Sequence, residues 1–176
     1  MGNGRVVVGV DGSPASLQAL WVAVEEARRR SAPLTVVHAP TIVGRATPAP
    51  AAGIGPATPP APSGGILSAE EEQRGRLIIE DAFVELYGGH PGDIAIRAVI
   101  SRLAPAPALV NSVGPEDLLV VGRSRRGFLR WLFAGSVSRI CSTAAPCPVL
   151  VVPGPADPKR SYSSSRLHRR ARNSSE

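Results

Sequence analysis

Aromatic side chains and cysteines are both scarce in this sequence. Aromatic residues make up only 4% of the 176 residues, whereas hydrophobic residues of all kinds make up 43%. The core must therefore be aliphatic, and the length suits one domain better than two. Only two cysteines occur, Cys141 and Cys147, which is too few for a disulfide framework. Both are expected to be small buried side chains in a protein of a reducing compartment.

Long apolar runs and the common catalytic motifs are also missing. No apolar stretch is long enough to cross a membrane, and residues 1–5 show no signal-peptide pattern, so no membrane association and a cytoplasmic location are expected. The sequence has no P-loop, no intact G-x-G-x-x-G fingerprint and no cysteine or histidine spacing typical of a metal site. Ser13 has no His–Asp pair near it in sequence, which favours a helix cap over a nucleophile.

Glycine and proline are abundant instead, with 18 residues of each. Residues 40–65 contain repeated prolines among Ala, Gly and Thr, a pattern that predicts a long mobile loop. The formal net charge is +6, and much of it lies in residues 154–176, which we predict to be a disordered basic tail. Such a tail offers only salt-sensitive, unspecific contacts, so nucleic acid is not the expected partner.

The rest of the sequence alternates between short apolar runs and amphipathic segments. Strands are predicted over residues 6–10, 34–39, 94–100, 117–121 and 148–152. Helices are predicted from Ser13–Pro14 to the stop at Ala32–Pro33, and over residues 68–87, 107–112 and 136–144. The second helix should direct four apolar side chains inward: Leu77, Ile78, Phe83 and Leu86. This alternation predicts an α/β fold, a doubly wound five-stranded parallel sheet with helices on both faces.

One candidate site segment follows the first strand, at the edge where open parallel sheets bind ligands. It runs from Gly9 through Val10 and Asp11 to Gly12 and Ser13. Asp11 suits either a turn into the first helix or contact with a ribose hydroxyl or a magnesium ion. His38, at the end of the second strand, is expected to be packed or hydrogen-bonded rather than catalytic.

A second candidate segment follows the fourth strand and is rich in glycine and arginine. Gly135 and Ser136 precede a helix, whose first N–H groups suit a phosphate. The segment also carries cationic donors that suit phosphate oxygens: Arg123, Arg125, Arg126 and Arg130. The alternative is an ordinary capped helix that follows a solvated basic loop.

Several motifs in this order resemble the universal stress protein family. Residues 6–16 are similar to its opening strand and turn, residues 34–39 to its second strand and residues 117–122 to its fourth. Residues 132–138 and 145–152 resemble its C-terminal signature. The match runs from about residue 5 to residue 153, which implies a universal stress protein domain over residues 1–153.

The resemblance also implies a nucleotide site. ATP-binding members carry the motif G-x2-G-x9-G-[ST] after the fourth strand. Gly122 fills the first glycine, Gly135 and Ser136 fill the last pair, and Arg125 stands in place of the middle glycine, with Gly127 two residues on. The implied ligand is ATP, with Mg²⁺ near Asp11. Its ribose would lie near Gly9, Val10 and Asp11, its adenine near the backbone of Val37, and its phosphates among Gly122, Arg123, Arg125, Gly127, Gly135, Ser136, Val137 and Ser138.

The resemblance implies a regulatory role in stress adaptation and a homodimer that pairs through the strand at 148–152. No general base is evident, so any ATP hydrolysis should be slow. Two alternatives stay open. Arg125 favours a stress protein that has lost nucleotide binding and acts through dimerisation, and the basic tail favours, more weakly, a protein associated with nucleic acid.

Overall fold

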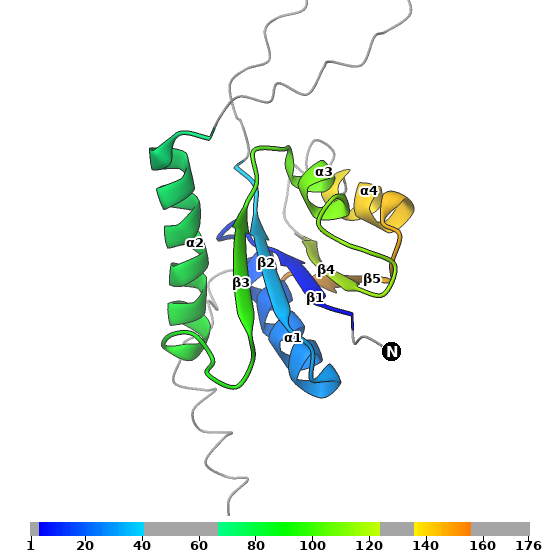
Figure 1. The fold of residues 1–176 in the computed structure, drawn as a ribbon, viewed down its shortest axis with the longest axis horizontal. Helices are drawn as coiled ribbons and strands as arrows, with labels where there is room; N and C mark the ends of the chain where they lie inside the picture. Colours follow the sequence, from blue (N-terminus) through cyan, green and yellow to red (C-terminus); the bar gives the residue numbers. More distant parts are fainter. Residues whose placement is uncertain (1–3, 41–66, 124–135, 156–176) are drawn as a thin grey trace, which may run out of the picture.

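The structure is a computed structural model that describes residues 4–40, 67–123 and 136–155. Five parallel strands form one sheet in the order β3-β2-β1-β4-β5 (Figure 1). The strands are β1 Val6–Gly9, β2 Leu34–His38, β3 Ile96–Ile100, β4 Leu118–Arg123 and β5 Val149–Pro153. The helices are α1 Pro14–Arg30, α2 Ala69–Tyr87, α3 Pro105–Val110 and α4 Ser136–Ala144. The predicted fold class is confirmed.

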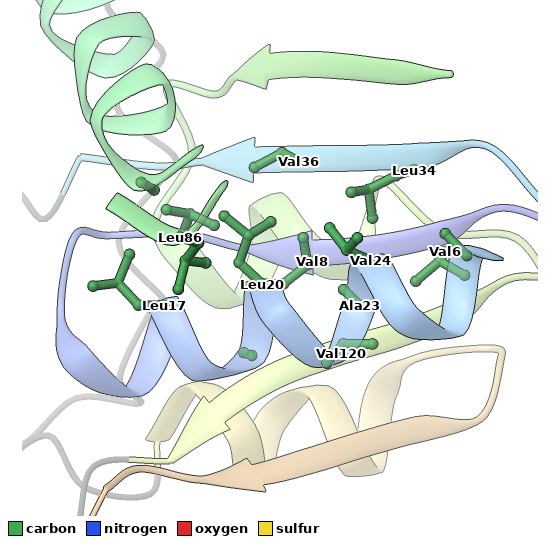
Figure 2. Close-up of a cluster of buried hydrophobic side chains, with 14 of the residues drawn as sticks. Val6, Val8, Leu17, Leu20, Ala23, Val24, Leu34, Val36, Leu86 and Val120 are labelled. Carbon is green, nitrogen blue, oxygen red and sulfur yellow. The ribbon is translucent and has the colours of Figure 1, made fainter. Parts of the chain in front are cut away.

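Two apolar clusters cover the two faces of this sheet. Alternate residues of β1 point to opposite faces: Val6 and Val8 join the cluster beneath α1 and α2, and Val7 joins the one beneath α3 and α4. Figure 2 shows the first cluster, with Leu20 and Val24 of α1 between the helix and the sheet. Helices on both faces explain why the buried strands read as continuous apolar runs rather than as alternating ones.

Short-range polar contacts set the helix ends where the sequence indicates. The Ser13 hydroxyl accepts a hydrogen bond from the Ser16 N–H at 3.2 Å, and Pro14 occupies the first helical position. Ser68 and Glu71 form a reciprocal capping box at the start of α2. Gly88, at φ 74°, ends α2 in the left-handed conformation that glycine adopts without strain.

Some predicted boundaries and faces were wrong. Leu77 is 51% exposed, and Ile79, which the sequence analysis did not select, is buried instead. The buried positions of α2 follow the helical period from Gly75 through Ile79 to Leu86, and Leu77 falls off that stripe. The fourth strand was predicted to end at residue 121, but β4 continues through Arg123. Gly122 and Arg123 therefore lie in the strand and not in the loop that follows it.

Most of the predicted loop and tail lies outside the described residues. At the tail boundary, Gly154 is buried, and its N–H donates to the Arg123 carbonyl at 2.8 Å. None of the helices in the described ranges is long and apolar enough to cross a membrane.

An ion pair joins the N-terminal end of the described chain to the start of β4. The Arg5 Nη2 lies 2.7 Å from Oδ2 of Asp117, whose side chain is buried. The Asp117 carboxylate also accepts the backbone N–H groups of Arg5 and Gly114, at 2.7 and 2.9 Å. Burial alone raises the pKa of Asp117, but the hydrogen bonds from Arg5 and Gly114 outweigh it and hold that pKa below its ordinary value.

The two apolar positions of α2 give the first prediction. Ile79→Ala should lower the free energy of unfolding by roughly 2–4 kcal/mol, because it removes buried methyl groups and leaves a cavity. The matched change Leu77→Ala removes an exposed side chain and should cost less than about 0.5 kcal/mol. Urea unfolding followed by circular dichroism measures both. Equal losses would contradict the assignment of the buried stripe.

The Asp117 contacts give the second prediction. A carboxyl whose pKa is lowered by folding stabilises the protein above its unfolded-state pKa of about 4, and this contribution is lost as the pH falls through the folded-state pKa. Asp117→Asn should therefore destabilise the protein by about 1–2 kcal/mol at neutral pH, and the difference should shrink in acid. Unfolding free energies over a pH series measure it. Asp93→Asn, which breaks the exposed pair with Arg28, is the control and should change stability little.

Candidate functional site

The candidate site lies beside β1, where the order in which strands are added to the sheet switches from one side to the other. The strands β1, β2 and β3 step outward to one side, whereas β4 and β5 occupy the other side of β1. Helix α1, which follows β1, and helix α4, which follows β4, lie on opposite faces of the sheet (Figure 1). In an open parallel sheet this is the position of the ligand-binding crevice.

The turn after β1 is held by side chains of its own. The Asp11 Oδ1 accepts the Ser13 N–H at 2.9 Å, and the Asp11 N–H donates to the Ser16 hydroxyl at 3.3 Å. Ser16 is buried, and its hydroxyl donates to the Ser13 carbonyl at 2.9 Å. Gly12 has φ 79° and takes the left-handed position of the turn. Asp11 thus has the turn role, while its side chain remains at an exposed position of the sheet edge.

Val10 is tied to the end of β2 through both of its backbone polar groups. Its N–H donates to the Val37 carbonyl at 2.9 Å, and its carbonyl lies 2.8 Å from Nδ1 of His38. His38 is only 6% exposed, so the expectation that it is packed and hydrogen-bonded is confirmed. Val37 is buried inside the ladder, and Ala39 is the first residue after the strand.

The glycines at the strand ends allow helices to approach closely. A Cβ added to Gly122 would overlap the carbonyl group of Ala15, so α1 can rest on β4 only because that position has no side chain. A Cβ on Gly9 would come within 3.1 Å of the Leu109 side chain on the opposite face. Gly122, the first glycine of the motif, therefore has a packing role in this fold that does not depend on any ligand.

The phosphate side of the predicted site is described in part. α4 begins at Ser136, followed by the half-buried Val137 and the buried Ser138. Arg123 is exposed at the end of β4. Arg125, Gly127 and Gly135 lie outside the described residues.

The described residues offer neither a metal-ligand cluster nor a reactive thiol. They contain no group of three or more His, Cys, Asp or Glu side chains that could hold a metal ion. Cys141 and Cys147 are free thiols, and Cys141 is fully buried. Burial raises the pKa of Cys141 to about 11 and also raises that of Cys147, so both stay protonated and unreactive at neutral pH.

Two residues of this region were missed by the sequence analysis as site components. Ser16 and the ring of His38 both contact the turn; both lie in segments that resemble the family, but neither was assigned to the site. The Ser13-x-x-Ser16 spacing could have indicated the first contact. The second depends on β2 lying beside β1, which a local pattern does not reveal.

Comparison with known proteins identifies the family. The model of the universal stress protein family matches residues 2–153. A universal stress protein of Mycolicibacterium smegmatis is 32% identical over 147 residues, covering 84% of this chain and 45% of that protein. One of Mycobacterium tuberculosis is 32% identical over 149 residues, covering 84% and 46%. The chain thus spans a little under half the length of these relatives.

Solved structures show the same fold. A universal stress protein in complex with cAMP superposes with a TM-score of 0.53 at 24% identity, covering 85% of this chain and 96% of that one. The Archaeoglobus fulgidus universal stress protein in complex with dAMP gives a TM-score of 0.52 at 20% identity, covering 86% and 99%. From the family match over residues 2–153 and the order of its strands, this chain belongs to the universal stress protein family.

Proposed function

We propose that this chain binds an adenine nucleotide, ATP, at the carboxyl edge of its sheet, and that it acts as a regulator or sensor in stress adaptation. Two solved relatives of the same fold are complexes with adenine nucleotides, cAMP and dAMP.

The observation that carries the proposal is the reversal of strand order between β1 and β4. It brings the turn at Asp11 and Gly12 to the same edge as Gly122 and Arg123, because the carboxyl ends of parallel strands share one edge. A ligand at this edge can meet a carboxylate from the first turn and a cation from the fourth strand.

The parts of the nucleotide are assigned to the two segments. The ribose would contact the turn formed by Gly9, Val10 and Asp11, and the adenine would lie at the end of β2, near Val37. The phosphates would lie among Arg123, Arg125, Gly127 and the residues Gly135, Ser136, Val137 and Ser138. Mg²⁺ would be held mainly by the nucleotide phosphates, with Asp11 as its protein ligand.

The proposal includes a homodimer that pairs through β5, and a cytoplasmic location. β5 contacts only β4 within the described sheet, and Leu150 on this edge strand is 37% exposed. An apolar edge strand favours pairing with its own copy, which satisfies the open backbone groups. The two free thiols fit a reducing compartment.

Arg125 gives a test of nucleotide binding. Arg125→Gly should weaken ATP binding by roughly 1.5–3 kcal/mol, because it removes a proposed charge-assisted contact to phosphate, and the sequence already offers a glycine nearby at Gly127. Gly135→Val should also weaken binding, since a β-branched side chain would crowd the start of α4. Isothermal titration with ATP and Mg²⁺ measures each.

Arg170→Gly is the matched control, with the same loss of charge in the predicted basic tail instead of the candidate site. Tighter binding by Arg125→Gly would show that the backbone freedom of a glycine matters more than the arginine charge. Wild-type protein without saturable heat at millimolar ATP would refute the proposal. If Arg125→Gly then bound ATP, the result would favour the alternative that this chain has lost nucleotide binding because Arg125 replaces the motif glycine.

The edge strand gives a test of association. The wild-type chain should sediment as a dimer at micromolar concentration, and Leu150→Lys should shift it to monomer, because a charged residue on an edge strand opposes pairing. Leu77→Lys is the control, since Leu77 is also exposed but lies on α2, and it should leave the dimer intact. A wild-type monomer in analytical ultracentrifugation would contradict pairing through β5.

A further inference from the structure

We propose that His38 is a positioning residue of the nucleotide site: its Nδ1–H donates to the Val10 carbonyl and fixes the peptide that leads into Asp11. The effect on nucleotide binding rests on the proposed function, whereas the contact between His38 and Val10 is given by the described residues. His38 lies at the end of β2, is 6% exposed, and places Nδ1 2.8 Å from the Val10 oxygen.

The ring of His38 continues the β1–β2 pairing where the ladder stops. The two strands pair in register only as far as Gly9 opposite Val37. The Val10 N–H still reaches β2 by donating to the Val37 carbonyl. A continuing parallel ladder would bring a backbone N–H to the Val10 carbonyl, and here the imidazole supplies the donor instead.

This contact determines the tautomer of the ring. A backbone carbonyl only accepts hydrogen bonds, so the proton of the neutral ring must sit on Nδ1 and leave Nε2 as the acceptor. Because His38 is buried, removing the donor would leave the carbonyl of Val10 without its partner in a poorly hydrated place, which is costly.

His38 thereby helps to fix the peptide unit between Val10 and Asp11, whose carbonyl and N–H are both hydrogen-bonded. Its carbonyl accepts from His38, and its N–H, that of Asp11, donates to the buried hydroxyl of Ser16 at 3.3 Å. Rotation of this peptide would redirect the Asp11 side chain, whose carboxylate closes the turn onto the Ser13 N–H. His38 and Ser16 therefore set, from two elements, how Asp11 faces the sheet edge.

Helix α2 holds the ring in this orientation. A Cβ added to Gly75 would lie 3.0 Å from Cδ2 of His38 and 2.9 Å from Cγ2 of Ile100. The helix thus lies against the imidazole at a position with no side chain, and His38 has little room to turn away. The contact couples α2 to the turn after β1 through one side chain.

The test compares two substitutions at the same position. His38→Asn keeps an N–H donor at the place of Nδ1, whereas His38→Leu keeps bulk and removes the donor. We expect His38→Leu to weaken ATP binding roughly tenfold and His38→Asn to stay within about threefold of wild type, the difference that one buried hydrogen bond makes. Titration calorimetry gives the affinities, and melting temperatures verify that each variant is folded. His90→Asn is the matched control, because His90 is exposed and pairs with Glu80.

A spectroscopic measurement tests the geometry without any ligand. Long-range ¹H–¹⁵N correlation spectra in mildly alkaline buffer should show His38, assigned by its loss in His38→Asn, as the Nδ1–H tautomer. Amide hydrogen exchange of Asp11 and Gly12 should accelerate in His38→Leu and not in His38→Asn. An Nε2–H tautomer would overturn the proposal, as would exchange at these amides that is equal in all variants.

The outcomes separate this inference from the proposed function. Wild type that binds no nucleotide refutes the function, while the tautomer and the exchange rates still decide whether His38 positions the turn. Wild type that binds ATP while His38→Leu binds equally well overturns the positioning role alone. Equal weakening by Leu and Asn would show that ring packing, and not the donated proton, is what matters, which also overturns it.

Discussion

The complete burial of the central strand is the constraint on which the rest of this structure depends. Val6, Val7 and Val8 have no exposed surface, so β1 must be flanked by strands on both sides and covered by helices on both faces. Burying apolar side chains on both faces of one strand provides much of the stabilisation available to a core with so few aromatics. Because β1 needs a neighbouring strand on each side, β2 and β4 are added on opposite sides of it. This switch in strand order creates the candidate site.

The close fit of α1 follows from the same constraint. Four alanines of this helix, Ala15, Ala19, Ala23 and Ala27, are buried against the sheet. Opposite Ala15, the strand β4 carries Gly122, where any side chain would overlap the helix backbone. Small residues on both partners therefore bring the start of α1 close to the end of β4. One glycine thus serves both the packing of the domain and the shape of the edge where a ligand is proposed to bind.

The turn after β1 shows how a site is supported by residues outside any motif. Asp11 and Gly12 form its tip, but Ser16 from α1 and His38 from β2 hold the peptide that precedes Asp11. A buried hydrogen bond stabilises little on balance, but leaving one of its groups unpaired is expensive. These two supporting contacts, from Ser16 and His38, can therefore fix the orientation of the exposed Asp11 carboxylate.

Local sequence determined the elements of this protein, and tertiary structure decided which residues meet. The apolar runs, the Ser13–Pro14 and Ser68–Glu71 helix starts and the stop at Gly88 were all predictable, because each depends on neighbours within a few positions. The inward side of α2 was not: Leu77 and Ile79 are equally apolar, and only the placement of the helix on the sheet buries one and exposes the other. Gly122 was predicted as a ligand contact, yet its packing against Ala15 became visible only when α1 lay on β4. The bond from His38 to Val10 likewise joins residues 28 positions apart, and it exists because parallel pairing aligns the ends of two strands that no local pattern connects.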